Sequence, residues 1–312
     1  MNRRRSPSKL LRWYPRAWRE RYGDEFAALL EDSAADGRLT FASRVSIVGS
    51  GLRERARGAG LTGDTASPVE RVRAGALLVL SAWAVFVVAG ASFSKMSEQF
   101  DVQVPAASRA LPWDAFAIVQ KVAVLAALLV GVGAAVAVPA LMKLLRDGGW
   151  PSISRHIFRA TAVTAVAVVA TAGLVPWAHS LSFAQRNGND WPYTIAFLMW
   201  ALLIVALLGL WTAAAVAIGR RLEFAPAILA TEALLAGALT TAMIAMTAAT
   251  ATWWAAIATD APWFLHGTAP GTSGSPFEPR LAIAIAAMTG ATALATFGTV
   301  RAACSWKLLR TG

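Results

Sequence analysis

The sequence has little charge and few side chains that carry chemistry. Only 15% of its 312 residues are charged, whereas a soluble globular domain has about 25%. The single cysteine, Cys304, excludes an intramolecular disulfide and a thiolate metal cluster. We interpret Cys304 as a small buried apolar residue of the last hydrophobic run.

The sequence also lacks recognisable catalytic motifs. It contains no glycine-rich phosphate loop, no HExxH pair and no GxSxG elbow. Its three histidines fall at predicted membrane boundaries, His156 on the inner side and His179 and His266 on the outer side, too far apart to share one metal. We therefore expect no catalytic residue, no metal and no cofactor, and a protein that is not an enzyme.

Long hydrophobic runs are what the sequence does contain. Hydrophobic residues make up 56% of the chain and its mean hydropathy is +0.52. The run Ala74 to Ser94 has no charge, and as a helix it would be about 30 Å long, which matches a bilayer core. Five similar runs follow. We predict an all-α polytopic protein whose membrane domain, residues 74–312, has six spans: 74–94, 119–142, 157–178, 193–219, 229–259 and 281–301.

The distribution of basic residues predicts the orientation of these spans in the membrane. With the N-terminus inside, 24 Lys and Arg lie on the inner side and five on the outer side, as the positive-inside rule requires. Tryptophans at the span ends agree with the boundaries, since indole is favoured at the headgroup level: Trp113, Trp150, Trp177, Trp191, Trp253, Trp254, Trp263 and Trp306. We expect a multi-pass plasma-membrane protein with both termini in the cytoplasm.

Inside the spans, small residues and threonines dominate, and one acidic residue is a candidate for function. Ala, Gly and Thr allow close helix approach and hydrogen bonds between helices or to backbone carbonyls. Pro139 and Pro176 are expected to kink or end their helices. Glu232, at the inner start of the fifth span, either faces the inner headgroups or pairs with an arginine inside the bundle.

The first 60 residues predict a small cytosolic head of three short helices, joined to the membrane domain by a linker over 61–73. The helices are expected over residues 8–14, over 16–34 and after the turn at residues 36–37. One apolar stripe lies on the second helix and another on the third, and we expect them to bury each other. The stripes are Trp18, Tyr22, Phe26, Leu29 and Leu30, and then Phe41, Val45, Val48 and Leu52.

Residues Leu10 to Asp32, LLRWYPRAWRERYGDEFAALLED, carry a Tyr-Pro-Arg and a Tyr-Gly-Asp element before a leucine-rich end. Over about the first 60 residues this pattern resembles the N-terminal module of HAAS-like, or permease-prefix-like, membrane proteins of actinobacteria. The resemblance implies a cytosolic signalling or docking module. It also implies association with PadR-like transcription regulators or with ABC transport systems, and no catalysis.

Two functions follow as hypotheses. The first is a membrane regulator or adaptor whose head docks a cytosolic regulator or a transporter through Trp18, Tyr22, Phe26, Leu29 and Leu30. The alternative is a transporter or an ABC-type permease subunit, for which six spans suffice. The inner loops are short, however, and no coupling-helix signature is present. The oligomeric state is left open.

Two clusters of arginine mark the head as basic. We expect them to contact anionic lipid of the bilayer, worth about 1 kcal/mol per basic group close to the surface. Nucleic acid is the less favoured partner, because the basic groups mostly flank membrane spans. The residues are Arg3, Arg4 and Arg5, and then Arg53, Arg55 and Arg57.

Overall fold

The computed structural model describes residues 7–37, 39–58, 67–97, 100, 104–182, 185, 190–222, 226–266 and 277–311. Among these residues all regular secondary structure is helical. Six of the described helices are long and apolar enough to cross a membrane, in agreement with the predicted number of spans. They are α3 (Pro68–Met96), α5 (Ala110–Arg146), α6 (Trp150–Ser180), α7 (Trp191–Gly219), α8 (Pro226–Asp260) and α10 (Pro279–Thr311).

The helices extend beyond the charge-free runs. Polar residues at their ends can form hydrogen bonds with the unpaired backbone groups of the terminal turns. Before α3, the Ser67 hydroxyl accepts from the Glu70 amide and the Glu70 carboxylate accepts from the Ser67 amide, a capping box followed by Pro68 at the first helical position. Pro139 and Pro176 lie inside α5 and α6 and end neither helix. Two short helices, η2 (Ala106–Ser108) and α9 (Pro262–His266), lie between the spans.

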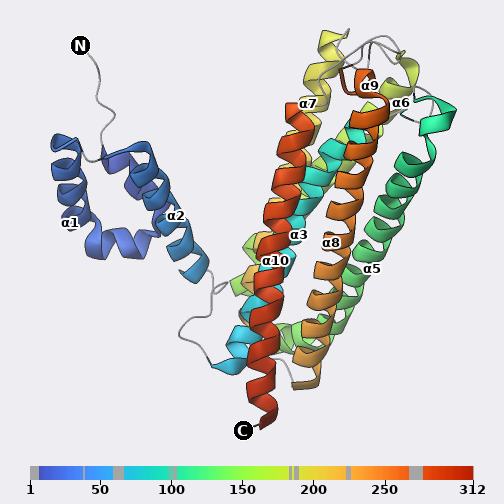
Figure 1. Ribbon diagram of the computed structural model, residues 1–312. Helices are drawn as coiled ribbons and strands as arrows, with labels where there is room; N and C mark the ends of the chain where they lie inside the picture. The colour runs from blue at the N-terminus through green and yellow to red at the C-terminus, as the bar shows by residue number, and fades with distance from the viewer. Residues whose placement is uncertain are drawn as a thin grey trace.

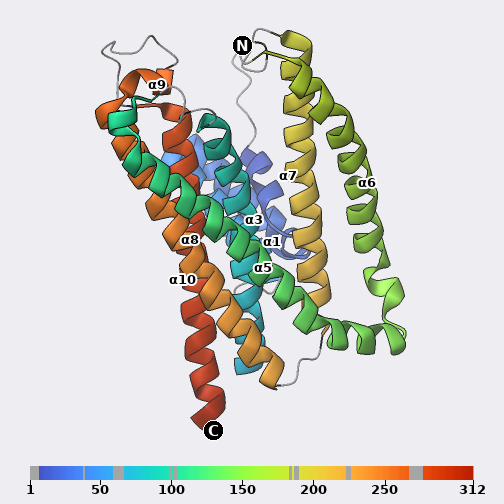
Figure 2. The same cartoon turned by 90° about the vertical axis from the view of Figure 1, so that its right-hand side faces the viewer.

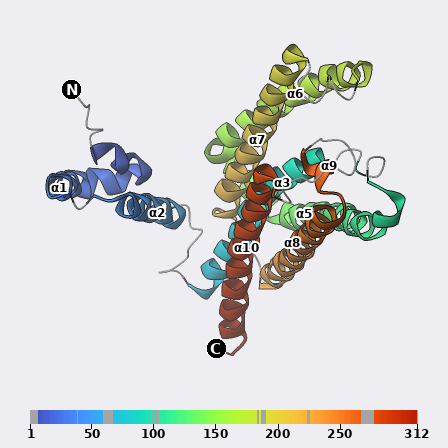
Figure 3. The same cartoon turned by 45° about the horizontal axis from the view of Figure 1, so that its top comes forward.

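Four helices form the core of the bundle, and two stand at its side. The closest pairs are α3 with α10 and α5 with α8, while α8 also packs on α3 and α10. In contrast, α6 packs mainly on α7, and α7 reaches the core through α3. Figures 2 and 3 show this α6/α7 hairpin leaning away from the other four helices.

Basic residues gather at one end of the bundle, which we call the basic end. There α3 begins, α10 ends and α5 turns into α6 (Figure 1). Gly148, with a φ of 79°, makes that turn in a conformation that favours glycine. The opposite end is called the distal end. The basic end carries Lys143, Arg146, Arg155, Arg159, Arg220, Arg221, Arg301 and Lys307.

Small residues bring α3 and α10 into backbone contact. A Cβ built on Gly75 would lie 2.5 Å from the Gly298 carbonyl oxygen, and one built on Gly298 would lie 2.9 Å from the Gly75 oxygen. Neither position therefore accepts a side chain without a shift of the helices. The expected close approach through small residues is confirmed at this crossing.

Threonine hydroxyls also act as expected, within helices and between them. The Thr240 hydroxyl donates to the Ala236 carbonyl at 2.9 Å and lies 2.8 Å from the Thr299 hydroxyl. A second pair, Thr247 and Thr292, is 3.2 Å apart. Both pairs join α8 to α10 in the bundle.

Trp253 is fully buried at the distal end, with its ring centroid 5.1 Å from that of Phe93 and 5.7 Å from that of Phe100. The expected burial of Cys304 is wrong. Cys304 is exposed, because it falls on the outer face of α10, next to the buried positions Ala302 and Ser305 but not among them.

The head consists of η1 (Pro7–Trp13), α1 (Arg16–Ala35) and α2 (Phe41–Gly58), which agree with the three predicted helices. Figure 1 shows them beside the bundle. Much of the predicted linker, residues 61–66, lies outside the described residues.

The expected burial of two head stripes against each other is wrong. Both α1 and α2 pack on η1 instead. A Cβ on Gly51 would lie 3.0 Å from Trp13, so α2 approaches η1 through a glycine. Since η1 takes this face of α2, the apolar stripe on another face of the helix is left exposed.

Candidate functional site

The head presents an apolar surface, which we call the α2 stripe: Phe41, Val45 and Leu52. Their exposed fractions are 82%, 54% and 48%. At 3.6 residues per turn, these positions lie along one side of the helix. Exposed apolar side chains that line up in this way make α2 a candidate interaction surface.

The docking stripe predicted on α1 is largely the core of the head. Trp18 stacks on Tyr14 with ring centroids 4.1 Å apart, Phe26 meets both rings edge-on, and Leu30 is buried. Only Tyr22 and Leu29, with exposed fractions of 40% and 61%, remain at the surface. The structure thus brings the predicted residues together, but mostly facing inward.

Tyr14 joins this core to α2. Burial raises the pKa of the Tyr14 phenol, and the nearby Glu54 charge raises it further, while a hydrogen bond with the Ser50 side chain lowers it. The neutral phenol is therefore the form that the folded head holds.

The predicted lipid-binding arginines have different surroundings. Arg53 is exposed, and Arg57 forms an ion pair with Glu54 at 2.6 Å. Arg55 donates from Nε to the Trp13 carbonyl at 2.7 Å and from Nη2 to the Arg12 carbonyl at 2.6 Å, so it holds the end of η1 on α2. Arg3, Arg4 and Arg5 lie outside the described residues. Contact with anionic lipid stays a prediction for all six.

A second candidate site is a cavity of about 490 Å³ near the basic end, which we call the basic-end cavity. Its walls come from α3, α5, α7 and α8, and they are almost entirely apolar. A volume of this size is typical of small-molecule sites. The apolar walls include Leu77, Leu80, Trp83, Leu208, Leu235 and Leu239.

Among the described residues, Glu232 and Arg73 are the two ionisable ones that line this cavity. Arg73 donates from Nη1 to the Leu222 carbonyl at 2.9 Å, which ties the start of α3 to the segment that follows α7. Glu232 forms no ion pair with Arg73 or with any other residue in the described part of the chain. Its Oε2 would lie 3.6 Å from a Cβ built on Gly133 of α5, so the carboxylate faces across the cavity.

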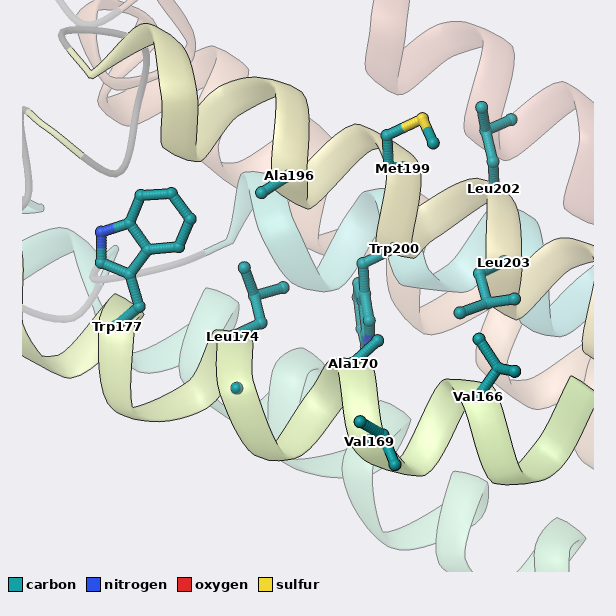
Figure 4. Close-up of a pocket in the computed structure, with 11 residues that line it drawn as sticks. Val166, Val169, Ala170, Leu174, Trp177, Ala196, Met199, Trp200, Leu202 and Leu203 are labelled. Atoms are coloured by element: carbon teal, nitrogen blue, oxygen red, sulfur yellow. The ribbon is translucent and has the colours of Figure 1, made fainter.

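A further hollow of about 630 Å³ lies between α6 and α7 (Figure 4). Trp200 reaches from α7 toward Ala170 of α6, and its Nε1 donates to the Thr171 hydroxyl at 2.8 Å. None of the described residues that line this hollow is ionisable.

Potential metal ligands do not cluster in the described ranges. No group of three or more His, Cys, Asp or Glu there could hold a metal ion. His266 lies 3.9 Å from a Glu278 oxygen at the distal end, and His156 lies near the start of α6 at the basic end.

The sequence pointed to Glu232 as a candidate, but it did not predict the cavity around Glu232. It also did not predict that the α2 stripe is an exposed surface. Arg73 ends the charged segment before the first span, and hydropathy alone assigns it to the headgroups. Only the packing of α3 beside α7 and α8 places it in a cavity with Glu232. Comparison with protein-family models, with curated proteins and with solved structures gives no match for this chain.

Proposed function

We propose that the protein is an integral membrane adaptor in which the bundle anchors a cytosolic head and the head binds a partner protein. The observation that carries this proposal is the α2 stripe, three aligned apolar side chains that the head leaves exposed. The resemblance of residues 10–32 to HAAS-like modules supports the same role, with a transcription regulator or an ABC transporter as the class of partner.

The charge around the stripe indicates the kind of surface it fits. Arg44 precedes Val45, Arg53 follows Leu52, and both are exposed. Because successive residues of a helix are about 100° apart, these arginines border the stripe on opposite sides. An amphipathic helix with an apolar face and acidic flanks complements such a surface. We therefore assign a partner helix of this type to the α2 stripe.

Site-specific photo-crosslinking in living cells tests the proposal on the full chain. A photoreactive residue at Val45 should give a discrete protein adduct, and the same residue at exposed Ser46, about 100° around the helix, should give much less. Phe41→Ser should remove the Val45 adduct without unfolding the head, since Phe41 is mostly exposed. Adducts with lipid alone, or equal adducts at both positions, would contradict docking of a protein.

The basic-end cavity supports a second candidate function, that of a transporter. A carboxylate in a mainly apolar cavity within a bundle is the kind of group that defines a substrate site. Counterflow of a labelled alkylamine in vesicles that contain the protein tests transport as distinct from binding. Flux that Glu232→Gln leaves unchanged would remove Glu232 as the substrate-binding group.

A further inference from the structure

We propose that the basic-end cavity binds an amphiphile that carries an ammonium group, with the ammonium at Glu232 and the apolar tail along the walls from α3, α5, α7 and α8. This site is separate from the α2 stripe. It would bind its ligand whether or not the head docks a partner, and whether or not the ligand is transported.

The charge of the ligand follows from Glu232. A carboxylate inside an apolar site is costly unless an opposite charge neutralises it. The described residues offer no such partner: Arg73, the other ionisable group of the cavity, is directed to the Leu222 carbonyl. A ligand cation would supply the missing charge and a strong, charge-assisted hydrogen bond.

The aromatic wall favours the same ligand. Trp211 and Trp83 both line the cavity. The indole Nε1 of Trp211 donates to the Thr164 hydroxyl of α6 at 3.0 Å, so the polar edge of this ring is occupied and fixed. The faces of indole rings attract ammonium groups, and the ring carbons also pack against an alkyl chain.

The position of the cavity indicates two sources for such a ligand. The cavity lies near the basic end, where a membrane lipid with an ethanolamine headgroup could enter sideways between α7 and the core. A lipophilic amine dissolved in water or membrane carries the same ammonium chemistry. In the first case Arg73 at the rim would also meet the lipid phosphate.

Binding of radiolabelled dodecylammonium to the full-length protein tests the proposal. The protein is placed in nanodiscs of phosphatidylglycerol, which has no ammonium group, and the signal of empty nanodiscs is subtracted. We expect saturable binding. Unlabelled dodecylamine should displace the probe, whereas dodecanol and dodecanoate should not displace it. Glu232→Gln should weaken binding by about tenfold or more, since one charge-assisted hydrogen bond is worth at least that factor.

Two further variants test whether the ligand binds in this cavity and at this carboxylate. Gly133→Leu should also abolish binding, because its side chain would enter the cavity, where the nearest atoms lie 3.6 Å and 3.7 Å from the built Cβ. Asp114→Asn, a matched loss of one exposed carboxylate near the distal end of α5, should leave the affinity unchanged. Equal affinity in Glu232→Gln and wild type, or equal binding of dodecanoate, would overturn the proposal.

A second arm separates the two sources. Nanodiscs that also contain phosphatidylethanolamine should reduce dodecylammonium binding by competition if the lipid is the occupant. Native mass spectrometry should then retain that lipid on the wild type and not on Glu232→Gln. Undiminished binding in those nanodiscs assigns the site to free lipophilic amines.

Discussion

Gly75 is the residue that most tightly limits the packing of the bundle. Its missing side chain allows α3 to lie on the backbone of α10, with no room for a Cβ beside the Gly298 carbonyl. We expect Gly75→Ala to lower the free energy of unfolding by about 1–3 kcal/mol, as for overpacking of a filled core. Thermal unfolding followed by size-exclusion chromatography in detergent measures this loss.

Gly90 provides the matched control on the same helix. No atom lies within 4 Å of a Cβ built there, so Gly90→Ala should be neutral or slightly stabilising. Equal melting temperatures of the two variants would show that α3 and α10 are not in backbone contact.

The hydroxyl pair of Thr240 and Thr299 makes a small and measurable contribution. Their oxygens lie 2.8 Å apart between α8 and α10. In a double-mutant cycle with Thr→Val at each position, we expect a coupling energy of about 0.6 kcal/mol, the average for hydrogen bonds between membrane helices. Thr241, exposed and bonded only to the Gly237 carbonyl of its own helix, should show no coupling to Thr299.

Among the elements, α2 depends on Arg55 to hold η1. Because its guanidinium donates to two carbonyls at the end of η1, we expect Arg55→Ala to destabilise the head by about 1 kcal/mol. Limited proteolysis of the full-length protein should then cleave the head several times faster within η1 and α1. Arg53→Ala, an exposed arginine two residues away, should leave the cleavage rate at the wild-type value.

The membrane helices were predictable from the sequence because the bilayer sets their length. A charge-free run of about 20 residues has few alternatives to a spanning helix. Their pairing was not predictable, since apolar faces of such helices look alike and no water selects the face that is buried. Hence the expected burial of Cys304 was wrong, although Cys304 lies in a helix that was predicted correctly.

In the head, helix positions were predictable from apolar periodicity, but the partner of each face was not. The contact of Gly51 with Trp13 and the hydrogen bonds of Arg55 to η1 cannot be predicted from a hydrophobic pattern. They turn one face of α2 toward η1 and leave Phe41, Val45 and Leu52 exposed. The surface assigned to the partner therefore moved from α1 to α2.

At the scale of the whole molecule, the basic residues and the packing features linked to function gather at the same end of the bundle. The basic end carries most of the lysines and arginines of the bundle, and it is also where the head joins α3 and where the cavity with Glu232 lies. The α6/α7 hairpin, which contacts the core mainly through α7 and α3, borders that cavity. A ligand in the cavity would therefore touch both the hairpin and the helix to which the head is attached.

A head that meets its partner in the cytosol must lie on the inner side of the membrane, and labelling of single cysteines tests this most directly. In a Cys304→Ala background, cysteine is introduced at exposed Ser46 of α2 or at exposed Ser180 at the distal end of α6. The positive-inside rule predicts that a membrane-impermeant maleimide labels intact cells at Ser180→Cys and labels Ser46→Cys only after permeabilisation. Labelling of Ser46→Cys in intact cells would place the head outside and contradict docking of a cytosolic partner.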